Sequence, residues 1–268
     1  MQNSALWQIE FGEGPLVACA IHDGHGLRAD VAECLKLSPA ERRYEEDPFT
    51  GAWTSIAPTR IIAARSRFEL DLNRPRDKAV YLSSADAWGL DLWKCQPPAA
   101  IVKRSLEIYD DFYAHLKLLL QRLVDCHGEV VVFDLHSYNH VRRGSGGALA
   151  NQAENPEINL GTGTMARALW APIVDCWLRA MREFDFLGRP LDVRENVKFV
   201  GGHLPRWIHD NFASSVCVLA IEVKKFFMDE WSGDLDVEQH RAIGSALAHA
   251  AAAVGDELIK VKRGPTVA

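Results

Sequence analysis

Three short runs of this sequence are apolar through most of their length, and polar residues lie at or just beyond the end of each. They are Leu16–Ile21 (LVACAI), Glu129–Asp134 (EVVVFD) and Val216–Val223 (VCVLAIEV). Such runs lack the alternation of a half-exposed strand and are typical of strands buried on both faces of a parallel sheet. This feature constrains the fold most, because a sheet buried on both faces must be covered by helices on both sides.

Segments with helical spacing of apolar residues separate these runs. The predicted helices are Arg104–Cys126, Met165–Phe184 and the Ala-rich Val237–Val261. Shorter predicted strands are Arg60–Ala64, Arg67–Leu72 and Val197–Val200, and Val141–Gly163 is a predicted long loop. The alternation predicts an α/β fold of three layers, in which a central, mixed and twisted sheet lies between helices. We expect a single domain over residues 1–268.

The composition narrows the class of protein. Hydrophobic residues make up 48% and charged residues 25%, which is ordinary for a soluble protein, and no apolar stretch reaches the ~20 residues of a membrane span. The net charge of −6 argues against nucleic acid as a partner. The six scattered cysteines and an N-terminus without signal-peptide features predict a cytoplasmic protein. A homo-oligomer is compatible with these properties.

Residues with catalytic or ligand chemistry follow or end several predicted strands. His22 and His25 follow the first strand, Asn73 and Arg74 follow RFELDL, and His136 follows VVVFD, while Glu222 lies within VCVLAIEV. Ligands of open α/β sheets bind at the carboxyl ends of the strands, so we expect these side chains to converge at one edge.

Two of these residues, His22 and His136, have the character of metal ligands. Catalytic zinc sites usually combine three His, Asp or Glu ligands with an open position. The third predicted ligand is Glu46 of the acidic run in YEEDPFTG, and the alternative is His25. Asp47 would then orient a ligand from outside the coordination sphere. We predict one Zn²⁺ ion, or another divalent metal in its place.

Glu222 is the predicted general base, because apolar neighbours would desolvate its carboxylate and raise its pKa. A buried ion pair with Lys224 or Lys225 is the structural alternative. A carboxylate substrate would be held by Arg74 and Asn73, with Arg142 adding positive charge and His203 a donor for the oxyanion. For Arg74, an ion pair with Asp71 or Asp77 is equally compatible with the local sequence.

The order of these motifs resembles that of the N-formylglutamate amidohydrolase family. HDGHG, EEDPFTG, SRFELDLNRP, FDLHSYNH, GGH and AIEVKKFFMDE carry the resemblance, which runs from about residue 15 to residue 235. It implies a phosphorylase/hydrolase-like α/β fold, as in the related zinc carboxypeptidases and aspartoacylase. It also implies metal ligation by His22 and His136, substrate binding by Asn73 with Arg74, and water activation by Glu222.

These observations together predict a zinc-dependent amidohydrolase. Its substrate would be a small anionic N-acyl amino acid, for example an N-formyl amino acid, or a related carboxylate with a linear amide bond. The metal would polarise the carbonyl and activate water, and Glu222 would accept the proton. Two alternatives are a non-catalytic binding protein that retains the fold, and a hydrolase with Ser137 as nucleophile and His140 as base.

Overall fold

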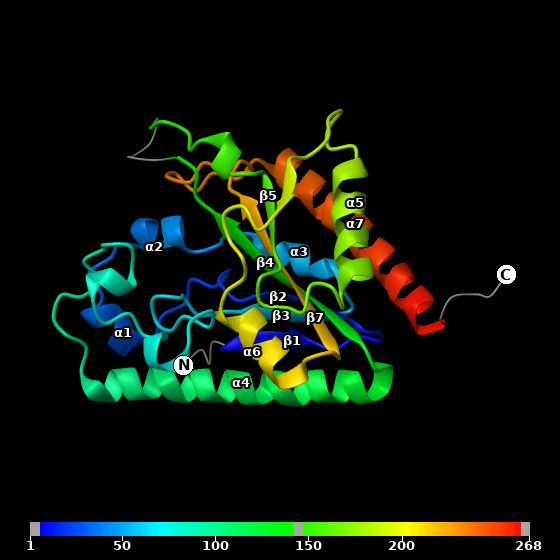
Figure 1. The fold of residues 1–268 in the computed structure, drawn as a ribbon. Coiled ribbons are helices and arrows are strands. Elements are labelled where there is room, and N and C mark those ends of the chain that lie inside the picture. The colour runs from blue at the N-terminus through cyan, green and yellow to red at the C-terminus, as the bar shows by residue number, and fades with distance from the viewer. Residues whose placement is uncertain (1–5, 142–146, 264–268) are drawn as a thin grey trace.

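A seven-stranded sheet forms the centre of the computed structural model, which describes residues 6–141 and 147–263. The strand order is β1-β3-β2-β4-β7-β5-β6. Figure 1 shows the sheet together with its surrounding helices. The strands are β1 (Trp7–Glu10), β2 (Leu16–Ala20), β3 (Thr59–Ala63), β4 (Val130–Tyr138), β5 (Ile158–Gly161), β6 (Val193–Glu195) and β7 (Val216–Lys224). Strands β3, β2, β4 and β7 are parallel, whereas β1 and β5 run antiparallel to their neighbours β3 and β7. The predicted mixed sheet is confirmed.

Helices cover both faces of this sheet. The long α4 (Ala99–His127) and α6 (His203–Phe212) pack on one face. On the other lie α5 (Ala171–Glu183), α7 (Val237–Arg263) and the short α3 (Thr50–Trp53). Helices α1 (Ala29–Cys34) and α2 (Pro39–Glu45) belong to the connection between β2 and β3. Four 3₁₀ turns span Thr54–Ile56, Arg76–Lys78, Ser84–Asp86 and Gln152–Glu154. The three-layer α/β prediction is thus confirmed.

Strand β4 explains the absence of alternation in the sequence. Val130 and Val132 lie in the core shared with α4 and α6, whereas Val131, Phe133 and Leu135 lie in the opposite core with α5 and α7. Both sets of side chains are buried, and each large apolar side chain that is fully buried contributes about 1.5–3 kcal/mol. A strand with two buried faces therefore needs apolar residues at successive positions, and its polar residues at the carboxyl end are buried as well.

The predicted strand Arg67–Leu72 is wrong. The segment forms turns, although Phe68, Leu70 and Leu72 are buried at alternating positions. Its intervening acids Glu69 and Asp71 are buried as well, in contact with arginines and a histidine. The apolar side chains of this segment therefore alternate with buried, ion-paired acids, and the acids do not face the solvent as they would in a half-exposed strand.

Other boundaries also differ from the prediction. The strand predicted at Val197–Val200 lies earlier, as β6, and β5 occupies part of the predicted loop Val141–Gly163. Helix α5 begins at Ala171 rather than at Met165, with a proline in its first turn, which is the helical position that tolerates proline best.

Helix α7 is long and apolar enough to meet the length and composition criteria for a membrane-spanning helix, which the sequence analysis did not predict. By length and composition, Val237–Lys260 could cross a membrane, and 39% of an 18-residue window within it is buried. Core helices of soluble proteins satisfy the same test. Residues Ala246, Leu247, Ala250 and Val254 of α7 are completely buried in the core on the α5 side of the sheet, so the finding is weak evidence for a membrane span.

Candidate active site

The carboxyl ends of three neighbouring parallel strands meet at one cavity. His22 follows β2, His136 lies near the end of β4, and Glu222 is paired with His136 in the register of β7. All three line a cavity of about 610 Å³. The predicted convergence at this edge is therefore observed for these residues, because parallel neighbours present their ends on the same side of the sheet.

Three buried side chains in this cavity have the spacing of metal ligands. The Oδ2 atom of Asp47 lies 2.9 Å from Nδ1 of His136 and 3.4 Å from Nδ1 of His22. One ligand atom from each residue lies within 4.8 Å of the other two. Among the described residues, this His₂Asp group is the one set of His, Cys, Asp and Glu side chains arranged to hold a metal ion.

A carboxylate lies beside the Nε2 atom of each histidine, on the side of the ring away from Asp47. Asp71 Oδ1 lies 2.7 Å from His22 Nε2, and Asp71 is itself held by Arg67 at 2.8 Å and by the Tyr81 hydroxyl. Asp134 Oδ1 lies 3.1 Å from His136 Nε2, although without the alignment of a full hydrogen bond. A carboxylate behind a ligating histidine fixes its ring and tautomer. Both rings are thus oriented with Nδ1 toward Asp47.

The electrostatics of this group fit a cation. Burial alone would raise the pKa of Asp47, but its hydrogen bonds with His136 and His22 hold that pKa far below its usual range. Burial alone would lower the pKa of His136, but Asp134 and Asp47 raise it well above its usual value. Without a metal the group therefore retains a proton. Zinc takes imidazole nitrogen and carboxylate oxygen and displaces such protons, so the residues fit this ion.

Backbone contacts place Asp47 in the cavity. Its N–H donates to the His22 carbonyl at 3.0 Å, and its own carbonyl accepts from the Thr50 hydroxyl at 2.7 Å. The buried Lys225 donates to the carbonyls of Tyr44 and Glu46 at 2.7 and 2.8 Å. These bonds attach the segment that follows α2 to strands β2 and β7.

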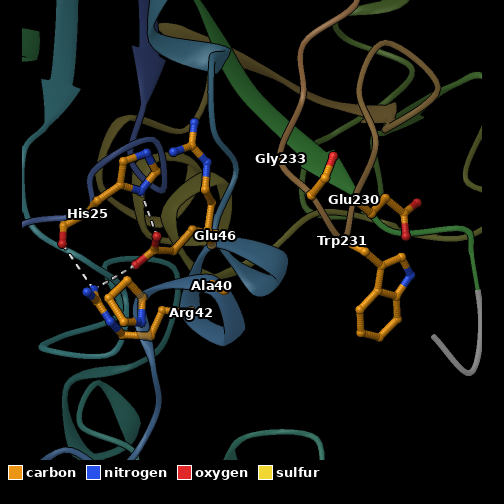
Figure 2. A pocket seen from close by; sticks show the side chains of 10 residues that line it. His25, Ala40, Arg42, Glu46, Glu230, Trp231 and Gly233 are labelled. Atoms are coloured by element: carbon orange, nitrogen blue, oxygen red, sulfur yellow. Dashed lines mark hydrogen bonds and ion pairs between the residues drawn. The ribbon is translucent and has the colours of Figure 1, made fainter. Parts of the chain in front are cut away.

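Glu46 and His25 are not part of the group formed by His22, Asp47 and His136. Glu46 Oε2 lies 2.6 Å from His25 Nδ1, and its other oxygen contacts Arg42 (Figure 2). That oxygen also accepts a hydrogen bond from the Ser66 hydroxyl. Glu46 has extended backbone, in which successive side chains point to opposite sides. Glu46 therefore faces a separate cavity of about 290 Å³, and the acid that lies beside His22 and His136 is Asp47, which becomes a further candidate for the third ligand next to Glu46 and His25.

Glu222 has the environment predicted for a general base. Burial raises the pKa of its carboxyl to about 8; the nearby His136 opposes this shift, and Asp47 adds to it. The alternative ion pair is not observed, because Lys225 binds backbone carbonyls and Lys224 donates to the Asn155 carbonyl. The carboxylate therefore lines the cavity beside the candidate ligands.

Arg74 and Asn73 also line this cavity. Arg74 donates to the Asp86 carbonyl at 3.1 Å and lies over the Tyr81 ring, and within the described residues it makes no ion pair with a carboxylate. Asp71, its alternative partner in the sequence, binds Arg67 instead. The Asn73 side chain accepts from the N–H of Leu204 at 2.9 Å, which fixes it beside the start of α6.

The other predicted site residues are His203, Arg142 and the pair of Ser137 with His140. His203 packs on the Tyr113 ring at 5.8 Å and is not part of the lining, and Arg142 lies outside the described residues. The Ser137 hydroxyl is buried without a hydrogen-bond partner, while His140 Nδ1 lies 2.6 Å from Glu230. The nucleophile and base pair of a serine hydrolase is therefore not formed.

Sequence reasoning missed several residues of the wall. Arg67 and Lys225 add positive charge, and the aromatic residues are Tyr44, Trp88, Tyr138 and Phe199. Only Asp47 carried a usable signal, since it belongs to the acidic run in front of a turn. Tyr44 belongs to α2 and Tyr138 ends β4, whereas the other four lie outside the helices and strands, where their placement depends on the whole fold.

Comparisons with known proteins agree with this architecture. The sequence model of the N-formylglutamate amidohydrolase family matches residues 14–228. The crystal structure of N-formylglutamate amidohydrolase from Ralstonia eutropha superimposes with a TM-score of 0.71 at 20% identity, covering 96% of this chain and 98% of that one. A gene product from Agrobacterium tumefaciens gives 0.66 at 17% identity, covering 96% of both chains. No curated protein matches the sequence. With four fifths of its length matched by the family model, the chain belongs to the N-formylglutamate amidohydrolase family.

Proposed function

We propose that this protein is a metal-dependent amidohydrolase that cleaves the linear amide bond of a small N-acyl amino acid or a related carboxylate. Membership of a hydrolase family supports the reaction class. The observation that carries the proposal is the convergence of His22, Asp47 and His136 in one cavity with Glu222.

His22, Asp47 and His136 would hold the ion, for which zinc is our proposal. When bound, zinc supplies Lewis-acid chemistry, which polarises a carbonyl group and makes water more acidic. Asp71 and Asp134 keep the two imidazole rings in position from behind. Asp47 offers the anionic ligand, which partly neutralises a dication in this buried site.

Glu222 takes the proton from the attacking water and returns it to the leaving amine nitrogen as the amide bond breaks. A carboxyl group whose pKa lies near the working pH can perform both transfers. Its position opposite His136 in the sheet register keeps it beside the ligands throughout.

Arg74 recognises the substrate carboxylate. It lines the cavity without an ion-pair partner in the described part of the chain, so its guanidinium is available for a planar two-point contact. Asn73 supplies a further polar contact beside it. The aromatic wall and the 610 Å³ cavity leave room for acyl groups larger than formyl, which motivates a broad substrate panel.

The test combines metal analysis of the purified protein with hydrolysis assays on N-formyl, N-acetyl and longer N-acyl amino acids. We expect about one zinc per chain and release of the free amino acid. Glu222→Gln should retain the metal and lose at least ~100-fold in kcat. Glu238→Gln, an exposed position on α7, is the matched control and should keep full activity.

The second candidate function is a binding protein that has retained the fold. It would bind metal and an anionic ligand without turnover. If the panel shows ligand binding but no hydrolysis, with Glu222→Gln indistinguishable from the wild type, the catalytic proposal is wrong and the binding function stands.

A further inference from the structure

Two cysteines from distant parts of the sequence lie next to each other outside the candidate active site. Cys34 ends α1, and Cys95 lies in the segment that leads into α4. Their thiol groups are close enough to interact electrostatically, and Cys34 is partly exposed while Cys95 is exposed. The pair is therefore accessible to small reagents from solution.

A short antiparallel ladder holds the pair together. Leu35 pairs with Trp93, the N–H of Lys94 donates to the Cys34 carbonyl at 2.9 Å, and the N–H of Lys36 donates to the Leu92 carbonyl at 2.7 Å. Directly opposed residues in such a ladder have Cα atoms about 4.5–5.5 Å apart. Cys34 lies opposite Lys94 in this pairing, so Cys95 is its neighbour one residue further along the facing segment.

The ladder attaches a segment that forms part of the cavity wall. Within residues 84–95, which we call the Trp88 segment, the Trp88 side chain lines the cavity and the Asp86 carbonyl accepts from Arg74. Trp93 anchors the segment by donating to the Tyr81 carbonyl at 2.7 Å. Leu35 and Leu92 join Phe68 and Tyr81 in a small core of their own, separate from the two main ones.

The other cysteines differ in their surroundings. Cys19, Cys176 and Cys217 are buried. Cys126 is exposed near the opposite end of α4, about 40 Å from the start of that helix at 1.5 Å per residue. Cys126 therefore offers an internal control with similar exposure and without the paired geometry.

We propose that Cys34 and Cys95 are a modification site at which a small disulfide oxidant, such as glutathione disulfide, forms a reversible disulfide that fastens the Trp88 segment to α1. The exposed Cys95 thiolate attacks one sulfur of the oxidant and displaces one small thiol. The Cys34 thiolate then attacks the Cys95 sulfur and displaces the second. Two protein thiols are thus oxidised, and one oxidant disulfide is reduced to two thiols. This inference does not depend on the proposed hydrolase function.

The disulfide would close a long loop that contains α2, Asp47 and Arg74. Closing such a loop restricts the unfolded chain and stabilises the folded protein, more so for longer loops. For a chain of this size we expect the Tm of the oxidised protein to lie about 5–10 °C above that of the reduced protein.

The experiment uses the full-length protein, equilibrated with reduced and oxidised glutathione in increasing ratio. Free thiols are then alkylated and located by peptide mass spectrometry. We expect one internal linkage between the peptides of Cys34 and Cys95, a rise in Tm, and reversal of both by dithiothreitol. Cys34→Ser and Cys95→Ser should abolish the linkage and the rise in Tm, whereas the control Cys126→Ser should keep both.

Two outcomes would overturn the inference. One is a stable glutathione adduct on Cys95 while Cys34 stays open to alkylation. The other is a linkage that forms only in denaturant or involves a different cysteine. If a serine variant does not fold, peptide mapping of the wild type under native conditions still decides between these results and the expected one.

Discussion

Glu46 and Asp47 are consecutive acids whose carboxylates face opposite sides of one extended backbone segment. Asp47 contacts His22 and His136, whereas Glu46 contacts His25 and Arg42. We expect Asp47→Asn to weaken zinc affinity at least ~100-fold, because it removes the charged ligand of a buried site. Glu46→Gln, the matched control, should change it by less than ~10-fold.

Competition with a zinc-binding dye measures both affinities. Equal loss in the two variants, or loss in Glu46→Gln alone, would restore Glu46 as the ligand. The sequence could predict that this run supplies an acidic candidate ligand near the candidates His22 and His136. It could not select the residue, because that choice depends on the backbone direction after α2, which the contacts of Lys225 and Thr50 determine.

His209 is a buried histidine that is held neutral. Its Nε2 accepts from the N–H of Val218 at 3.1 Å and its Nδ1 bonds the Thr164 hydroxyl, while burial lowers its pKa to about 4. The unfolded chain binds a proton near pH 6.5, so the folded state loses about 2–3 kcal/mol of relative stability as the pH falls from 6.5 to 4.

The variant His209→Gln tests this pH dependence. Glutamine can still accept from Val218 but does not titrate, so the variant should be about 1–2 kcal/mol less stable at pH 7 and lose this disadvantage at pH 4.5. Urea unfolding at the two pH values measures the difference. A stability gap that is the same at both would mean that His209 does not titrate in this range.

At the scale of elements, the start of α6 depends on close packing between Gly202 and Asn73. A Cβ added to Gly202 would lie 2.3 Å from Asn73 Oδ1, so the Asn73 side chain would have to move and lose its bond to Leu204. We expect Gly202→Ala to raise the KM of the proposed substrate about 10-fold. Gly255→Ala on α7 is the control, because its added Cβ meets only an ordinary contact at 3.5 Å with Leu16.

A double-mutant cycle shows whether this effect acts through Asn73. Asn73→Ala alone should also raise KM, and adding Gly202→Ala to it should cost little more, because the side chain to be displaced is absent. Independent, additive effects on KM would mean that Gly202 acts on the cavity by another route.

The sequence predicted the elements with strong patterns and missed those with weak ones. The strong patterns are the apolar runs of β2, β4 and β7 and the helical periodicity of α4 and α7. Each of these patterns is typical of a single kind of secondary structure. Helix α6 and strand β5 are short, and their burial is supplied by neighbours distant in the sequence. In Arg67–Leu72 the apolar residues do alternate with polar ones, as the strand prediction assumed. The polar residues Glu69 and Asp71, however, are buried in ion pairs with arginines, whereas a half-exposed strand would present them to solvent.

For the molecule as a whole, metal occupancy should control stability. Asp47, Asp71 and Asp134 are buried within one region, and a dication bound there would offset their charge. Removal of metal by a chelator should lower Tm, and zinc at ~1,000 times its Kd should restore about 4 kcal/mol, or roughly 8–16 °C. Scanning calorimetry measures both, and Asp47→Asn should show neither change; an equal response in that variant would place the ion elsewhere.

Glu222 should make the stability of the metal-free protein fall with rising pH. Its folded-state pKa of about 8 lies above the ~4.5 of the unfolded chain, so the folded state binds the extra proton between these values and loses that advantage as the pH rises through 8. Glu222→Gln cannot ionise, so at pH 9 the metal-free variant should exceed the wild type by at least ~1 kcal/mol, about 2–4 °C in Tm, and should match it near pH 5. Calorimetry in chelator at both pH values measures this, with Glu238→Gln as the control. A constant difference between Glu222→Gln and the wild type would mean that Glu222 is already ionised in the metal-free fold, and that its carboxylate stabilises the site before any ion arrives.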